Sequence, residues 1–336
     1  MKIIGFFNNK GGVGKTSLVY HVAWMLSLMN HRVIAVDLDP QANLTSMFLS
    51  EERLEEIWDK PDHEITIYDV ISPQFRGTGD IRPPHVQMVF DPIDPISESI
   101  GLLIGDLKLS LIEDTLSDAW PRCQNREERA FRVMSAFART IAAAGHAHHA
   151  EIAVVDVGPN LGALNRAALL ACDYVVVPLG ADLFSLQGLR NMGPTMRDWR
   201  NTWGEAQTKN PDKNLVLPEG RMLPIGYVVM RFSTTESRPA RAYAKWITRM
   251  PKQYREFILD EKDAPESDPE SDPNRLATLK DYRSLMPMAQ EARKPMFRLR
   301  PADGAFGGHQ QAVTGCYDDF QSLTRKILER SGGDEG

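Results

Sequence analysis

A glycine- and lysine-rich run near residue 10 has the composition of a loop that binds phosphate groups. It follows an apolar run at residues 2–7 and reads Lys10-Gly11-Gly12-Val13-Gly14-Lys15-Thr16-Ser17. Glycines let the backbone close around an anion with several N–H groups pointing inward, and a helix that starts after the loop adds its positive dipole end. The second half of the general pattern G-x-x-x-x-G-K-[ST] is intact, whereas Asn9 replaces its first glycine. A glycine-rich turn without a ligand is the alternative, and the strand and helix expected on either side disfavour it.

Carboxylates follow two further apolar runs that we expect to be strands. Asp37 and Asp39 come at the end of the run 32–37, and Asp156 ends the run 152–156. Open α/β sheets bind their ligands at the carboxyl ends of the strands, where a carboxylate can be presented to Mg²⁺. The three aspartates could instead cap the turn or the helix that follows each of them.

The pattern of apolar residues predicts a single α/β domain over residues 1–330. Apolar residues recur at the helical period from residue 16 to about 29, and a second helix is expected at 161–171. Further strands are expected at 101–104, 152–156, 174–178 and 225–230. Because these strands are apolar throughout, both faces of the sheet must be covered. The predicted fold is a doubly wound, mostly parallel sheet with helices on both faces.

Three segments are predicted to lie outside this core. Residues from about 50 to 100 contain six prolines and are expected to form peripheral loops and short helices. Residues from about 260 to 274 carry seven acids against one lysine, which accounts for the formal net charge of −6 of the 336-residue chain. This acidic segment has three prolines and no large apolar residue, so we expect a solvated, disordered loop. A disordered tail is expected at 331–336.

Cysteine usage and hydropathy indicate the cellular compartment in which the protein is expected. Cys123, Cys172 and Cys316 are widely spaced and form no CxxC pair, so neither a disulfide framework nor a zinc site is supported. No run approaches the ~20 apolar residues that cross a bilayer, and the first residues do not form a signal peptide. We therefore expect a cytoplasmic protein.

The glycine-rich loop resembles the variant Walker A loop of the ParA/MinD family of P-loop ATPases. That variant carries a second lysine at its start, here Lys10, and does not require glycine at the position of Asn9. Residues 37–43 resemble the switch I segment of the family, and residues 151–165 resemble its strand-Asp-x-x-Pro element followed by switch II. The segments 171–179 and 185–189 also fit the family pattern. The resemblance covers residues 1–49 and 150–195 and thins elsewhere.

The resemblance implies ATP and Mg²⁺ as cofactors of residues 10–17. In such a site Lys15 binds the β- and γ-phosphates, and Thr16 ligates Mg²⁺ together with Asp156. Asp37 supports the water shell of the metal, and Asp39 orients the attacking water. Lys10 reaches the phosphates of a partner subunit, which implies a homodimer that forms on ATP binding. We expect slow ATP hydrolysis that a ParB-like activator raises, with ATP acting as a timer.

A row of basic residues suggests what such a switch acts on. Its members recur at steps of three and four, which would align them on one helix face: Arg238, Arg241, Lys245, Arg249 and Lys252. The row could bind DNA phosphates without reading bases, and DNA binding by ParA relatives favours this. A solvated helix face paired with the acidic segment is the alternative. Pro251 limits the helix, because proline breaks the hydrogen-bond ladder.

Several functions compete within this resemblance. The leading hypothesis is a partition ATPase that positions or segregates DNA or other cargo. A regulatory ATPase of a mobile-element or defence locus is an alternative, as is a MinD-like positioning ATPase. The last helix, expected at 317–330, is followed by an acidic, glycine-rich end, so we expect it to pack on the domain and expect no membrane partner. A reductase of the nitrogenase iron protein kind would need cluster-binding cysteines, and Cys172 is badly placed for that role.

Overall fold

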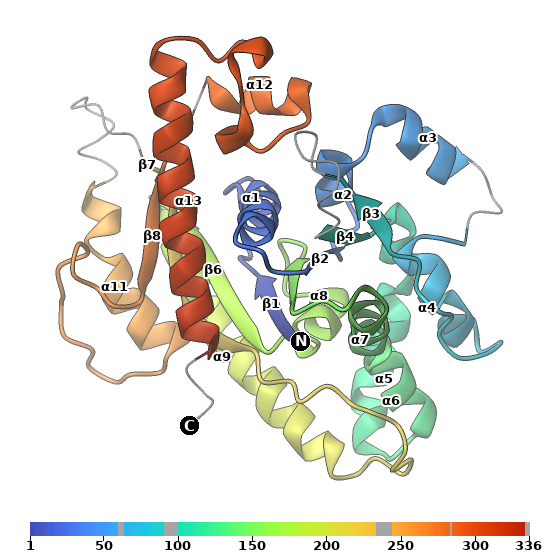
Figure 1. Ribbon diagram of the computed structural model, residues 1–336. Helices are drawn as coiled ribbons and strands as arrows, with labels where there is room; N and C mark the ends of the chain where they lie inside the picture. The colour runs from blue at the N-terminus through green and yellow to red at the C-terminus, as the bar shows by residue number, and fades with distance from the viewer. Residues whose placement is uncertain (60–63, 91–99, 233–243, 283, 333–336) are drawn as a thin grey trace.

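A twisted, eight-stranded sheet runs through the centre of the described part of the molecule (Figure 1). The computed structural model describes residues 1–336 except 60–63, 91–99, 233–243, 283 and 333–336. The strand order is β3-β4-β2-β5-β1-β6-β7-β8, and every neighbouring pair is parallel except β3 and β4. The strands are β1 Lys2–Phe6, β2 Val33–Asp37, β3 Gln87–Val89, β4 Ile100–Leu103, β5 Ile152–Asp156, β6 Tyr174–Gly180, β7 Leu223–Phe232 and β8 Arg275–Lys280.

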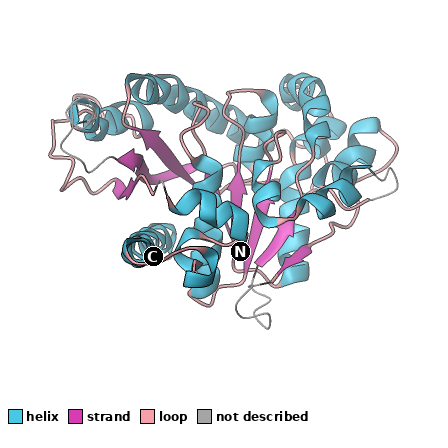
Figure 2. Ribbon diagram, turned by 90° about the horizontal axis from the view of Figure 1, so that it is seen from above, coloured by secondary structure: helices cyan, strands magenta, loops and turns pink. Residues whose placement is uncertain are grey.

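Helices cover both faces of this sheet (Figure 2). One face is packed against a core to which helices of the middle of the chain contribute: α4 Ile67–Arg76, α5 Glu113–Gln124, α6 Glu128–Met134, α7 Ala136–His148, α8 Ala163–Leu170 and α9 Leu183–Gln207. The opposite face is packed against residues from both ends of the chain: α1 Lys15–Leu28, α2 Asn43–Phe48, α3 Glu51–Asp59, α12 Leu285–Ala292 and α13 Gly308–Gly332. Short helical segments complete the chain: η1 Leu107–Ile112, α11 Met250–Gln253, the π-helix η2 Tyr254–Ile258, η3 Met296–Arg298 and η4 Pro301–Asp303. None of the described helices is both long and apolar enough to cross a bilayer.

Continuous apolar strands are the reason for this layered arrangement. All five residues of β2 and of β5 are buried. In β2, Ile34 and Val36 pack into the core of one face, whereas Val33 and Ala35 pack into the core of the other. Successive side chains of a strand point to opposite faces, so a strand that is apolar at every position needs helices on both sides. The predicted doubly wound fold is confirmed.

The region at 50–100 contains an edge strand in addition to the expected loops and short helices. Its strand β3 pairs antiparallel with β4 at the edge of the sheet. Its helix α4 begins with a capping box in which Thr66 and Asp69 satisfy each other's backbone N–H groups. Val70 and Ile71 of α4 are fully buried in the core of one face. The short helices α3 and α4 are of the expected kind, whereas the edge strand β3 and the buried residues of α4 were not foreseen.

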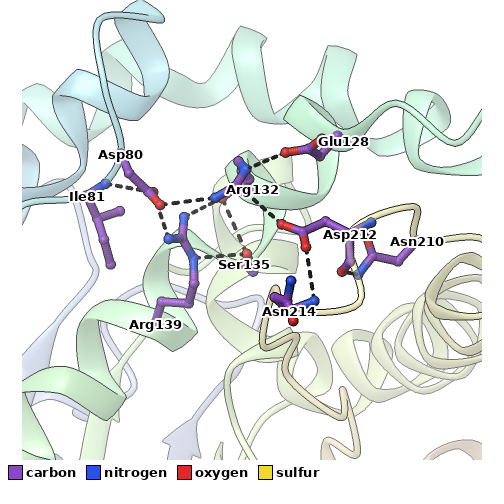
Figure 3. Close-up of polar contacts among 9 residues, drawn as sticks. All are labelled: Asp80, Ile81, Glu128, Arg132, Ser135, Arg139, Asn210, Asp212 and Asn214. Atoms are coloured by element: carbon purple, nitrogen blue, oxygen red, sulfur yellow. Dashed lines mark hydrogen bonds and ion pairs between the residues drawn. The ribbon is translucent and has the colours of Figure 1, made fainter.

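A polar network connects Asp80, which follows α4, to the rest of the domain (Figure 3). Asp80 lies between two arginines, 3.2 Å from Arg132 and 2.7 Å from Arg139. Arg132 also bonds to Asp212, at 2.7 Å, in the connection between α9 and β7. Because Arg132 pairs with both Asp80 and Asp212, the network joins three segments that are distant in sequence.

The acidic segment at 260–274 is not solvated throughout, so that prediction is wrong at Asp272. This side chain is 5% exposed and accepts a hydrogen bond from the Tyr227 hydroxyl, at 2.7 Å. A buried carboxylate needs such partners, and no pattern of residue types indicated them. The predicted tail at 331–336 is also corrected in part, because α13 continues to Gly332. Residues 333–336 lie outside the described part.

Candidate nucleotide site

The glycine-rich loop lies between β1 and α1, at the carboxyl edge of the sheet. Gly12 and Gly14 have positive φ angles of 74° and 92°, in the left-handed region that favours glycine. A Cβ atom on Gly11 or Gly12 would meet no described atom within 4 Å, so the outer side of the loop is open. Val13 is buried and anchors the loop, and α1 begins at Lys15. A loop of this form can receive an anion at the start of the helix.

Sheet pairing brings the predicted carboxylates to this loop. Asp37 at the end of β2 lies opposite Asp156 at the end of the adjacent strand β5. The Lys15 ammonium group contacts Asp156 Oδ1 and lies 3.9 Å from Asp39 Oδ2. Lys15, Asp37, Asp39 and Asp156 are all buried. Four residues that the sequence analysis selected separately therefore form one cluster.

The environment of Asp156 fits a magnesium ligand. Burial raises the pKa of Asp156, and the positive charge of Lys15 and the hydroxyl of Thr16 oppose that effect. Its Oδ2 atom is buried and has no hydrogen-bond partner among the residues that the structure describes. Carboxylate and hydroxyl oxygens are the donors that Mg²⁺ prefers. The residues present thus match the ion that the loop pattern implies.

Asp37 has structural contacts in addition to its place in the cluster. Its Oδ2 atom accepts hydrogen bonds from the backbone N–H and the hydroxyl of Thr45, both at 2.8 Å. Thr45 lies in the first turn of α2, and its hydroxyl also accepts from the N–H of Gly105 at 2.9 Å. Burial, followed by the charge of Asp156, raises the pKa of Asp37, while the bonds from Thr45 lower it. Asp37 therefore holds an N–H group of the first turn of α2, although the N-cap position of that helix is Ala42.

Lys10 makes its ion pair within its own subunit. Its ammonium group lies 2.5 Å from Asp182 Oδ2 and 6.0 Å from the centre of the Phe184 ring. Asp182 is also the N-cap of α9, because its Oδ1 atom accepts from the N–H of Ser185 at 2.9 Å. The carboxylate thus holds the start of a long helix and the second lysine of the loop together.

Glu113 is a residue of this region that sequence reasoning missed. Its two carboxylate oxygens accept hydrogen bonds from the N–H groups of Ala163 and Leu164, at 2.6 and 2.8 Å. These groups open α8, the helix that follows the predicted switch II segment, and a helix start attracts negative charge. A Cβ atom on Gly162 would come within 2.6 Å of Glu113. Because Glu113 lies 50 residues away in sequence, no local pattern could reveal the contact.

A largely apolar cavity of about 320 Å³ adjoins the loop and was also missed. It opens beside Gly14 and Ser17 and has the size and lining suited to a flat, aromatic base. Besides these two, the lining residues are Leu18, Met230, Leu279, Lys280, Asp281, Tyr282, Met286, Pro287, Met296 and Phe320. Most of them belong to the last third of the chain, where the sequence analysis had recognised neither β8 nor α12.

The three described members of the basic row, Lys245, Arg249 and Lys252, do not lie on one continuous helix, and the prediction is corrected for them. Residues 244–247 are helical, a turn follows at 248–249, and α11 starts at Met250. Pro251 occupies the first turn of α11, where its missing N–H does no harm. Lys245 and Arg249 are exposed and lie over the ring of Trp246, at 5.1 and 5.5 Å from its centre. Lys252, a further member of the row, lies 3.9 Å from Glu256. Arg238 and Arg241, the remaining members, lie outside the described residues.

Comparisons of the sequence agree on one family. The family model described as an AAA domain matches residues 1–208, more than half of the chain. The sporulation initiation inhibitor protein Soj of Bacillus subtilis is 30% identical over 196 residues, which are 58% of this chain and 65% of Soj. The chromosome partitioning protein ParA of Myxococcus xanthus is 28% identical over 196 residues, 58% of each chain. The matched part thus spans less than two thirds of either relative.

Solved structures with this fold extend over the whole chain. Protein DIP2308 of Corynebacterium diphtheriae superposes with a TM-score of 0.70 at 23% identity, covering 100% of both chains. The McdA protein of Cyanothece in complex with ATP has a TM-score of 0.62 at 14% identity, covering 99% of this chain and 96% of McdA. At these identities the similarity shows the fold. Together with the family match over the glycine-rich loop and both acidic strand ends, it establishes that this chain belongs to the ParA/MinD family of P-loop ATPases.

Proposed function

We propose that this protein is an ATP-dependent dimerising ATPase that positions or segregates DNA or other cargo. The observation that carries the proposal is the cluster around the glycine-rich loop. It contains Lys15 and three aspartates, and Lys10 lies in the same loop, paired with Asp182. These charges are suited to a magnesium-bound triphosphate. Phosphoryl transfer depends mainly on positioning and on neutralising charge, and these residues supply both.

In this proposal residues 10–17 hold ATP and Mg²⁺. The loop backbone and the start of α1 bind the phosphates, and the adjoining cavity receives the adenine. Lys15 leaves Asp156 for the β- and γ-phosphates, so that Asp156 and Thr16 become available to Mg²⁺, while Asp37 supports its water shell. Mg²⁺ supplies positive charge to the phosphates. Asp39, buried beside Lys15, orients the attacking water.

Exposed apolar residues next to Lys10 support a dimer. Leu183 and Phe184, at the start of α9, are 51% and 72% exposed. Large apolar side chains exposed beside a charged site are typical of a surface that another protein covers. We propose that a second copy of the chain packs here when ATP is bound, and that Lys10 then moves from Asp182 to the phosphates of the partner subunit.

DNA and an activating protein are the proposed partners. The relatives Soj and ParA are named for roles in sporulation and chromosome partitioning, which favours cargo of this kind. Lys245 and Arg249 are exposed and offer positive charge for phosphates of DNA. A ParB-like activator would raise a slow basal ATPase rate, and binding to DNA would hold the dimer at the nucleoid.

The proposal is tested by measuring nucleotide binding and particle size together. Calorimetry with magnesium-ATP should show saturable binding, and sedimentation should show a dimer with ATP and a monomer with ADP. Lys15→Ala should abolish both effects, because it removes the cation that neutralises the phosphates. Lys213→Ala, at an exposed position away from the loop, is the matched control and should behave as the unaltered protein. Absence of magnesium-ATP binding by the folded protein would refute the function.

A further inference from the structure

A buried side-chain amide lies beneath the switch II segment. Asn165, in the first turn of α8, is 1% exposed. Its Nδ2 atom donates to the backbone oxygens of Gly158 and Asn160, at 2.9 and 2.8 Å, and to Asn160 Oδ1, at 2.9 Å. Three acceptors therefore converge on one donor group.

The segment that Asn165 holds begins two residues after Asp156. A Cβ atom on Gly158 would lie 3.1 Å from Asn165 Oδ1 and 3.2 Å from its Nδ2, so the backbone runs directly over the amide. Asn160 Oδ1 also accepts from the N–H of Gly162, at 2.8 Å, which closes the turn. The amide thus connects the carboxyl end of β5 to the first turn of α8.

The helix that carries Asn165 is itself fixed. Glu113 holds its first N–H groups, at 2.6 and 2.8 Å. On its flank, the Arg166 guanidinium group lies 4.4 Å from the centre of the Trp120 ring in α5. Both contacts join α8 to α5, so Asn165 is attached to a rigid base. A side chain with such support can set the position of a loop precisely.

We propose that Asn165 is a positioning residue for ATP hydrolysis, whose amide donor fixes residues 158–160 relative to Asp156. This inference rests on the proposed function and names a residue on which its rate depends. Asn165 touches neither the phosphates nor the metal in this role. A displacement of about 1 Å in a reacting group lowers rates by about 10²-fold, so a loop that loses its anchor should hydrolyse ATP slowly while still binding it.

Replacing the donor without changing the shape gives a direct test. Asn165→Asp is isosteric, but it directs a carboxylate at three acceptors and should lower kcat by at least about tenfold at pH 8. The dissociation constant for magnesium-ATP should stay within about twofold, because the glycine-rich loop is unchanged. A buried aspartate among acceptors has a raised pKa and donates a hydrogen bond when protonated. The kcat of the variant relative to the unaltered protein should therefore rise as the pH is lowered from 8 to 6.

A matched control separates this role from the general cost of a buried carboxylate. Asn210 is 6% exposed, and its Nδ2 atom donates to the backbone oxygen of Asp212 at 2.7 Å, far from the loop in sequence (Figure 3). Asn210→Asp should lower the melting temperature without changing kcat. Should Asn165→Asp not fold, Asn160→Ala removes one of the acceptors at an exposed position and should lower kcat about threefold.

The outcomes distinguish the two proposals. An unaltered protein that neither binds nor hydrolyses ATP refutes the proposed function. If that protein hydrolyses ATP and Asn165→Asp matches its kcat at every pH, the positioning role is overturned. A parallel loss of kcat and of ATP affinity in Asn165→Asp would also overturn it, because a merely structural defect affects both. If only Asn160→Ala can be measured, an unchanged kcat in that variant overturns the positioning role.

Discussion

Lys10 is proposed to act on the phosphates of a partner subunit. In this structure, however, its side chain contacts Asp182 of its own chain. The two side chains are each 32% exposed, and their charged atoms are 2.5 Å apart. Burial raises the pKa of Asp182, but its bonds with Lys10 and with the N–H of Ser185 outweigh that effect and lower the pKa overall. Exposed ion pairs contribute at most about 1 kcal/mol, so an incoming phosphate can displace this one.

Removing the charge of Asp182 should favour the dimer. Asp182→Asn keeps an oxygen for the N–H of Ser185 but loses the ion pair, so Lys10 is released at lower cost. We expect the dimer dissociation constant with a non-hydrolysable ATP analogue to fall by up to about fivefold in sedimentation. Asp303→Asn, which removes the partner of Lys294 elsewhere, should leave it unchanged. A weaker dimer in Asp182→Asn would show that the pair does not restrain Lys10.

At the residue scale, the residue pattern predicts functional side chains that lie within a few positions of a motif. Asp156 ends an apolar run and Asp39 follows the end of another, and parallel pairing brings both strand ends to Lys15. Glu113 and Asn165 could not be selected in this way, because their partners are backbone groups of a helix start and a turn. Such contacts depend on the path of the folded chain and leave no pattern in the residue types.

At the scale of elements, the position of α8 depends on contacts with other helices as well as with the sheet. Its N-cap Gly162 has no side chain to offer, so the first turn relies on the carboxylate of Glu113. Trp120 and Trp199 flank Arg166 on the same helix, at 4.4 and 6.0 Å. The helix after switch II is therefore supported by α5 and α9.

Loss of the Glu113 carboxylate should destabilise the domain. Glu113→Gln removes the charge that the helix start attracts, and we expect the free energy of unfolding to fall by about 1 kcal/mol in chemical denaturation. Asp114→Asn, at the next position of α5, changes an exposed acid that the described contacts do not place on α8 and should cost less than about 0.5 kcal/mol. Equal effects of the two changes would contradict the capping role.

The segment after β7 should account for part of any DNA affinity. The double variant Lys245→Gln with Arg249→Gln should weaken binding to DNA of any sequence and reduce the slope of log affinity against log salt by about two. Lys262→Gln, an exposed lysine of the acidic segment, serves as the control and should leave the slope unchanged. An unaltered slope in the double variant would exclude these two residues from the DNA contact.

Strand β8 shows why part of the fold escaped the sequence analysis. Its buried residues are Leu276 and Leu279, and the positions between them are half-buried and mixed in type. A parallel strand at the edge of a sheet is covered less completely than a central one, so its apolar signal is weak. The central strands β2, β5 and β6 are buried almost throughout, β1 is buried from Ile4 to Phe6, and all four were predicted correctly.

At the scale of the whole molecule, His21 links the two ends of the chain. Its Nδ1 atom donates to the backbone oxygen of Ser17 at 2.7 Å, and its Nε2 atom accepts from the N–H of Met296 at 3.0 Å. The ring stacks on Phe320 of α13, with 5.0 Å between ring centres. The acceptor role of Nε2 requires a neutral ring, and burial lowers the pKa of His21 to about 4.

Acidification should therefore weaken the domain through His21. The pKa of His21 in the unfolded chain is about 6.5. Below that pH the imidazole binds a proton in the unfolded chain but not in the folded chain. The free energy of unfolding therefore falls as the pH drops from 6.5 to 4. The full effect is about 3 kcal/mol, measurable by denaturant titration at several pH values. His21→Asn does not titrate and should show a smaller slope over this range, despite lower stability at pH 7. An identical slope would assign the acid sensitivity to other groups.

The cavity beside the glycine-rich loop is lined by residues that are added to the chain at very different stages of translation. Gly14 and Ser17 emerge early, whereas Tyr282, Met296 and Phe320 emerge near the completion of synthesis. A nascent chain could thus form the glycine-rich loop long before the residues that line the cavity are synthesised. If the cavity receives adenine as proposed, tight capture of the nucleotide and the proposed pairing of two copies would be confined to polypeptides whose translation has reached Phe320.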